Sequence, residues 1–143
     1  MSAETNNHIF TTALRLFIDD YENGIYAPVT EADIQFYLMA LCKKLMQENN
    51  MPLDIHANYA IPKHESLKSK KIDIVIGSAI AIEIKFEANY PGVSKPVVFP
   101  AAAAKDIDRL NDLKLAGIDY CHFIFLDEDG THFRNFKMAV INT

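Results

Sequence analysis

Three charged side chains, Asp73, Glu83 and Lys85, interrupt an otherwise apolar stretch at residues 71–87, KIDIVIGSAIAIEIKFE. A buried strand rarely accepts unpaired charges, because each one loses its hydration. Two adjacent carboxylates repel each other and need positive charge, which a lysine and a divalent metal ion can supply together. With the Ile84 carbonyl, the carboxylates would form an oxygen site suited to Mg²⁺ completed by waters. A lysine beside metal-bound water can position that water for attack on a phosphate.

The turn between the two strands that carry these residues decides whether Asp73 meets Glu83. Side chains alternate along a strand, so a slip of one residue moves each of them to the other face. A two-residue turn over 77–78 would place Asp73 opposite Ile82, away from Glu83. A three-residue turn over 77–79 places Asp73 opposite Glu83, and we expect this turn.

The rest of the chain predicts the elements that must position these side chains. Helical spacing alternates with apolar or alternating runs typical of strands, and Thr30 with Asp33 forms a capping-box pattern. We expect helices over 3–21 and 30–48, strands over 53–61, 71–76 and 80–87, a helix over 100–117, a strand over 118–126, and a segment at 131–141 that fits a strand or a short helix, with the strand favoured. This α-α-β-β-β-α-β order predicts one α/β domain over 1–143, with a mixed sheet flanked by helices.

Helical periodicity also predicts which side chains face the core. The expected stripes are Ile9, Ala13, Leu16, Phe17 and Tyr21 in the first helix, Ile34, Leu38, Leu41 and Leu45 in the second, and Ala103, Ile107, Leu110 and Leu113 in the third. In the strand over 53–61, strict alternation predicts that Leu53, Ile55, Ala57 and Tyr59 point inward.

The charged residues and their spacing resemble the PD-(D/E)XK nuclease superfamily, whose core is restriction-endonuclease-like. Asp73 is followed, after nine intervening residues, by Glu83-Ile84-Lys85, and the α-β-β-β-α-β order of residues 30–126 matches the order of that core. The resemblance implies that Asp73 and Glu83 hold the metal and that Lys85 assists the attacking water. One departure is that Lys71-Ile72 stands where the name-giving proline would be, although that proline is often absent.

The superfamily often adds an acid from its first core helix, and Glu31 is the best match. It lies three residues before Ile34, at the edge of the inward stripe, whereas Asp33 has the capping role. A negative charge in the first helical turn also stabilises a helix by itself. The sequence therefore leaves both a catalytic and a purely structural role open for Glu31.

A basic run leads into the strand that bears Asp73. Its lysines could hold phosphates without reading sequence, although a solvated hairpin tip explains them equally well. They are Lys63, Lys68, Lys70 and Lys71. The whole chain has a net charge of −5, which argues against a basic surface overall. Lys105 and Asp106, in the later helix, resemble polar positions that often flank such nuclease sites, but a solvated face in the first helical turn is the favoured expectation.

Other features place the chain in a broad class. No segment is long and apolar enough to span a membrane, and no secretory signal precedes the first helix, so we expect a cytoplasmic protein. Cys42 and Cys121 lie in apolar runs without a CxxC motif, which predicts reduced core residues. The histidines show no spacing typical of zinc ligands.

Together these features predict a nuclease that hydrolyses phosphodiester bonds in DNA with Mg²⁺, for which Mn²⁺ would substitute. At 143 residues little remains beyond a catalytic core, so a homodimer or a partner protein would supply the grip on a duplex. Two other interpretations stay open. One is a catalytically silent nuclease fold that binds nucleic acid or protein, and the other is an α/β interaction domain with a solvated, charged sheet face.

Overall fold

A computed structural model of the chain describes residues 2–60, 71–87, 99–127 and 138–142. It is a mixed α/β structure in which five strands form one sheet, in the order β1-β2-β3-β4-β5. The elements are α1 (Ala3–Glu22), α2 (Glu31–Glu48), β1 (Ile55–Tyr59), β2 (Ile72–Ile76), β3 (Ile80–Glu87), α3 (Phe99–Leu115), β4 (Tyr120–Asp127) and β5 (Met138–Asn142). The predicted order of elements is confirmed, and so is the strand within the C-terminal segment.

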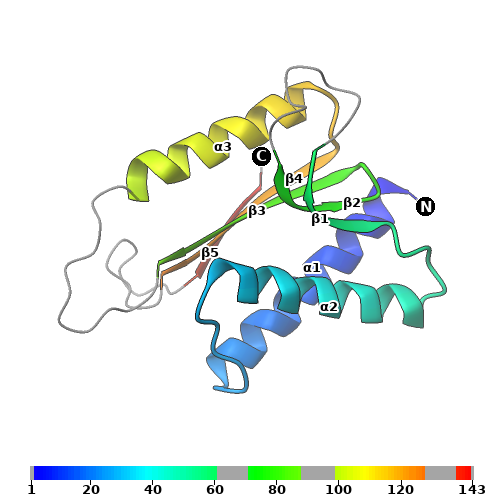
Figure 1. The fold of residues 1–143 in the computed structure, drawn as a ribbon. Coiled ribbons are helices and arrows are strands. Elements are labelled where there is room, and N and C mark those ends of the chain that lie inside the picture. The colour runs from blue at the N-terminus through cyan, green and yellow to red at the C-terminus, as the bar shows by residue number, and fades with distance from the viewer. Residues whose placement is uncertain (1, 61–70, 88–98, 128–137, 143) are drawn as a thin grey trace.

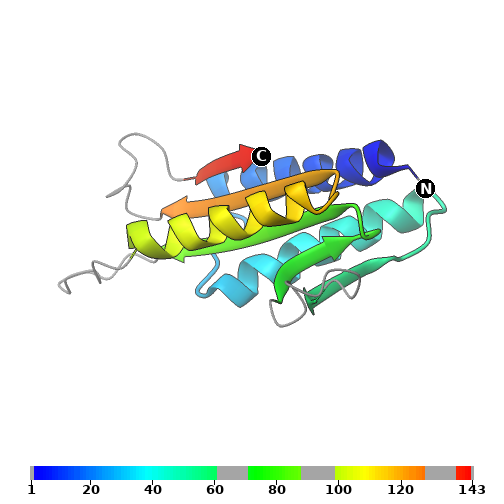
Figure 2. The same ribbon diagram turned by 90° about the horizontal axis from the view of Figure 1, so that it is seen from above.

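The helices cover both faces of the sheet. Helices α1 and α2 pack on one face, and α3 lies on the other, where it runs over β3 and β4 (Figures 1 and 2). Strands β3 and β4 are parallel, as the α3 crossover between them requires, and the other neighbouring pairs are antiparallel. The chain thus forms three layers around a central sheet.

Two apolar clusters hold these layers together, one on each face of the sheet. On the α1–α2 side the buried residues include Phe10, Phe17, Ile34, Leu38, Met46, Ile74, Ile76, Ile80, Ile82, Ile84 and Ile124. On the α3 side they include Val75, Ala81, Leu110, Leu113, Cys121, Phe123 and Phe125. Successive residues of β3 therefore face different layers, as strand alternation requires.

The start of α2 is fixed by the predicted capping box. The Asp33 N–H donates to the Thr30 hydroxyl at 3.1 Å, and the Thr30 N–H donates to the Asp33 carboxylate at 3.2 Å. Because Asp33 is engaged in this cap, Glu31 in the same turn is left to reach toward the sheet.

The turn between β2 and β3 has three residues, as predicted. Ile76 pairs with Ile80 and Ile74 with Ile82. Gly77 and Ser78 have φ of +60° and +53°, the signs that a type I′ turn requires. Ala79 is the third residue of the turn and makes the number of turn residues odd. Extending the observed register by one pair beyond Ile74 and Ile82 places Asp73 opposite Glu83.

Several predictions of inward-facing residues were wrong. Leu16 is 40% exposed, and Phe10 and Leu14 are buried on α1 instead. In β1, Ala57 is exposed and Leu53, just before the strand, is 45% exposed. Because β1 is an edge strand paired only with β2, the helices cover less of it than they would cover of a central strand.

Candidate functional site at the β2–β3 fork

Strand β3 extends past the point where β2 stops pairing with it. The ladder between them ends at Ile74 and Ile82, whereas β3 stays paired with β4 as far as Glu87. On the open side, the Ile84 N–H donates to Asp73 Oδ2 at 2.7 Å, and the Phe86 N–H donates to Glu31 Oε1 at 3.1 Å. Two carboxylates thus satisfy backbone groups that a strand would otherwise pair. We call this open edge the fork, and the name includes the side chains around it, which are Glu31, Gln35, Asp73, Glu83, Lys85, Asp106 and Arg109.

Asp73 is held at the fork through its backbone as well as its side chain. The amide nitrogen of buried Gln35 donates to the Asp73 carbonyl at 2.6 Å and to Asn58 Oδ1 at 3.2 Å. Asn58 itself has φ +49°, a conformation that asparagine tolerates better than most residues. Sequence reasoning missed Gln35, although its place one helical turn after Glu31 put both on one side of α2.

Glu83 is the most deeply buried charged group of the fork, with 3% of its surface exposed. Burial is the main cause that raises its pKa to about 9, and the charge of Asp73 and a hydrogen bond between the two carboxyl groups contribute in the same direction. Arg109 acts in the opposite direction, through an ion pair of 3.0 Å between its Nη1 and Glu83 Oε1. The solvated-face interpretation therefore fails for Glu83, because α3 covers this face.

Helix α3 contributes two residues to the fork. Asp106 is half-buried, and its pKa is raised by burial, while the charges of Lys85 and Arg109 act to lower it. The prediction that Asp106 lies on a solvated face was wrong, because α3 packs on the sheet and brings Asp106 near Lys85 and Arg109. Sequence reasoning missed Arg109. The available signal was its position directly before Leu110 in the predicted inward stripe.

Glu31 and Lys85 complete the group of predicted residues. Much of Glu31 is exposed, but its carboxylate lies against β3, and partial burial raises its pKa. The Phe86 N–H and the charge of Lys85 act to lower that pKa, while Asp73 and Asp106 raise it. The structure therefore brings all four predicted catalytic residues, Glu31, Asp73, Glu83 and Lys85, into one electrostatically coupled group.

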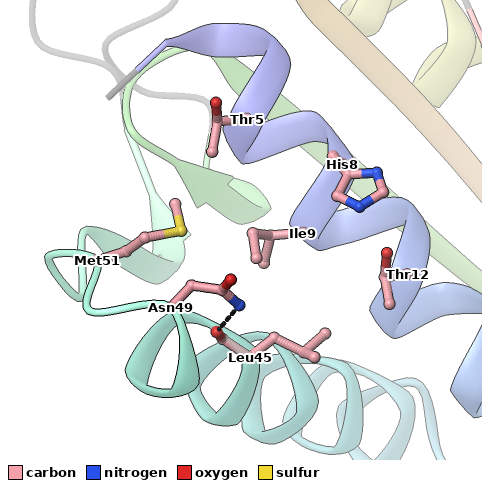
Figure 3. A pocket seen from close by; sticks show the side chains of 7 residues that line it. All are labelled: Thr5, His8, Ile9, Thr12, Leu45, Asn49 and Met51. Carbon is pink, nitrogen blue, oxygen red and sulfur yellow. Dashed lines mark hydrogen bonds between the residues drawn. The ribbon is translucent and has the colours of Figure 1, made fainter.

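A polar hollow opens at the fork. It has a volume of about 290 Å³ and is lined by Glu31, Ala32, Gln35, Asn58, Asp73 and Ile84. A second hollow, of about 260 Å³, lies between α1 and α2 and is lined by Thr5, His8, Ile9, Thr12, Leu45, Asn49 and Met51 (Figure 3). Of these two hollows, the one at the fork is lined by two carboxylates, whereas the second has His8 as its one titratable lining residue, so the hollow at the fork is the better suited of the two to a cation.

The donor atoms at the fork fit a hard divalent cation. No three His, Cys, Asp or Glu side chains among the described residues come together as a metal cage. Mg²⁺ does not need one, because it usually takes one or two carboxylates and completes its shell with water and substrate oxygens. Asp73 and Glu83 supply adjacent carboxylates, and the backbone of Ile84 in β3 lies beside them, with its N–H bound to Asp73 Oδ2.

Of the four predicted phosphate-binding lysines, Lys71 is the one that the structure describes. Lys63, Lys68 and Lys70 lie outside the described residues. Lys71 is exposed at the entrance to β2, and its carbonyl is 3.4 Å from Arg109 Nη1. Lys71 thus places one exposed cation beside the fork.

Residues assigned a structural role by sequence occupy structural positions. Cys42 and Cys121 are both free and buried. His122 is buried, with its Nε2 2.7 Å from Asn7 Oδ1 and its ring against Phe10. Across the described part of the chain, no helix is both long enough and apolar enough to cross a membrane.

Comparison of this chain with protein-family models, with curated proteins and with solved structures gives no match. The geometry of the fork therefore carries the functional argument.

Proposed function

We propose that the chain is a Mg²⁺-dependent nuclease of the PD-(D/E)XK type, with a restriction-endonuclease-like core, that hydrolyses phosphodiester bonds in DNA. The observation that carries this proposal is the pairing of Asp73 with Glu83 beneath α3. Their hydrogen-bonded carboxyl groups lie where burial and mutual repulsion favour a bound cation.

The roles follow from where each side chain lies. Asp73 and Glu83, with the Ile84 carbonyl, would hold the ion. When bound, Mg²⁺ neutralises charge on a phosphate and acidifies a coordinated water. Lys85, on the same face of β3 as Glu83, would orient that water and stabilise charge that develops on the phosphate. Glu31, fixed by the Phe86 N–H, would order waters around the ion.

Two further features support a nucleic-acid substrate. The N-terminal ends of α2 and α3 lie at the same end of the molecule as the end of β3 (Figure 1), and helix N-termini favour anions. Lys71 adds an exposed positive charge beside the fork. A phosphate chain that crosses the fork would meet these groups next to the acid pair.

The test is cleavage of plasmid and single-stranded DNA with Mg²⁺, Mn²⁺ or EDTA. Asp73→Asn, Glu83→Gln and Lys85→Met should each lower the rate by about 10²–10³-fold or more, because each removes a group that acts on the reacting phosphate or its ion. Glu48→Gln and Lys44→Met, at exposed positions of α2, are the matched controls and should cleave at the wild-type rate. Cleavage that survives all three fork substitutions, or none with any metal, would rule out the proposal.

A silent fork is the second candidate, and the ion pair between Glu83 and Arg109 favours it. This pair already gives the buried carboxylate a countercharge without any metal. A protein that binds DNA in EDTA as tightly as in Mg²⁺ and cleaves none of it would support a binding role.

A further inference from the structure

We infer that Arg109 is a positioning residue, which holds the Glu83 carboxylate in the orientation that a divalent cation at the fork requires. This inference rests on the proposed function, because it concerns the same metal site. It assigns a role to α3, the layer that the motif on β2 and β3 does not include.

The geometry gives Arg109 a fixed position. Leu110 and Leu113 are buried in the cluster formed with Phe123 and Phe125, so this part of α3 is anchored to the sheet. Arg109 lies at the edge of that contact, with 29% of its side chain exposed, while the Glu83 side chain is 4% exposed. Its Nη1 donates to Glu83 Oε1 at 3.0 Å and lies 3.4 Å from the Lys71 carbonyl. The guanidinium thus links α3 to β3 and to the start of β2.

The bonds of Glu83 show why Arg109 would orient the ligand rather than compete with the ion. Arg109 occupies Oε1, while the Glu83 carboxyl group also hydrogen-bonds Asp73. Asp73 and Glu83 would hold the cation together, while Arg109 keeps its bond to Glu83 Oε1. Hydrogen bonds of this kind, from a neighbour to a metal ligand, commonly govern metal affinity.

The experiment separates the hydrogen bond of Arg109 from its charge. Arg109→Gln removes the charge but keeps a donor for Oε1, and Arg109→Met removes both while keeping a similar length. The affinity of each purified full chain for Mn²⁺ alone is measured by electron paramagnetic resonance of free Mn²⁺, without nucleic acid. Arg109→Met should bind Mn²⁺ about 10-fold or more weakly than Arg109→Gln. Arg15→Met, on the exposed side of α1, is the control and should bind like wild type.

Circular dichroism and melting curves establish that each variant is folded. If Arg109→Met does not fold, Arg109→Ala takes its place, since a partly exposed side chain can be shortened with little loss of packing. Equal Mn²⁺ affinities of the two neutral variants, or tighter binding by the variant without a donor, would overturn the positioning role alone. A wild-type chain that binds no Mn²⁺ would overturn both this role and the metal-dependent function.

Discussion

The two faces of the central sheet are built from the same strands but carry different chemistry. Toward α1 and α2, strand β3 presents Ile80, Ile82 and Ile84, all buried in one apolar cluster. Toward α3, the intervening residues of the same strand are Ala81, Glu83 and Lys85, and Glu83 is as buried as the isoleucines. Burial is therefore similar on both faces, while the free energy it contributes is not.

The difference between buried isoleucines and a buried carboxyl group shows which residues of this fold stabilise it and which destabilise it. Buried aliphatic side chains stabilise the folded state, whereas a buried carboxylate beside another one destabilises it unless a cation or a proton compensates. A small domain tolerates the second arrangement only if the first is extensive. The apolar clusters would thus compensate for the carboxyl pair of Asp73 and Glu83.

The largest expected contrast is between adjacent residues of β3. Ile82→Ala should lower the free energy of unfolding by about 2–5 kcal/mol, because it leaves a cavity at a position with no exposed surface. Glu83→Gln, in metal-free buffer near neutral pH, should leave stability unchanged or raise it. Urea unfolding followed by circular dichroism measures both. Similar losses for the two variants would mean that the faces do not differ as described.

The second contrast is the response of each face to pH. The pKa of Glu83 is raised to about 9 in the folded state, above its ordinary value of 4.5. The unfolded chain therefore loses this proton first, and stability falls as pH rises from about 5 to about 9. In EDTA, the difference between the Tm of Glu83→Gln and the Tm of wild type should increase by several degrees across this interval, because glutamine cannot ionise.

Differential scanning fluorimetry across this pH range gives the measurement. Glu48→Gln, which removes an exposed carboxylate from α2, should follow wild type at every pH. A Glu83→Gln curve parallel to wild type would show that Glu83 does not carry the proton in question.

The smallest expected effect concerns the turn that joins the two strands. Gly77→Ala should cost about 2 kcal/mol, because φ is +60° and a Cβ would lie 2.6 Å from Asn6 Nδ2. Gly24→Ala is the matched control, since φ is +69° there but no atom lies within 4 Å of the added Cβ, and it should cost about 1 kcal/mol. Thermal melts measure both, and a larger loss for Gly24→Ala would contradict the contact with Asn6.

Much of the fold could be predicted because its signals are local. The Thr30–Asp33 capping box, the strand alternation of β3 and the glycine at the β2–β3 turn act over a few residues, so each was predicted where the structure has it. The odd number of residues in this turn was then enough to predict that Asp73 lies opposite Glu83. The errors at Leu16 and Leu53 arose because periodicity indicates which residues share a side, but not how much of that side a neighbouring element covers.

The fork itself was only half predicted. Asp73, Glu83 and Lys85 lie within 13 residues of one another in sequence and could be placed by counting, and Glu31 was proposed from its helix position. Gln35 and Arg109 could not be placed in this way. Their contacts with Asp73 and Glu83 join residues 38 and 26 apart in sequence, and no local pattern encodes such contacts.

The sequence by itself determined the elements, their order and the register of the β2–β3 hairpin, because hydrogen-bonding periods and turn geometry are properties of short segments. Only the tertiary structure decided that α3 lies over the charged face, that this face is buried, and that Arg109 meets Glu83 there. The reason is that burial and ion pairing depend on which distant element packs where. An acid on a strand becomes a candidate metal ligand, rather than a solvated charge, once a helix removes water from it.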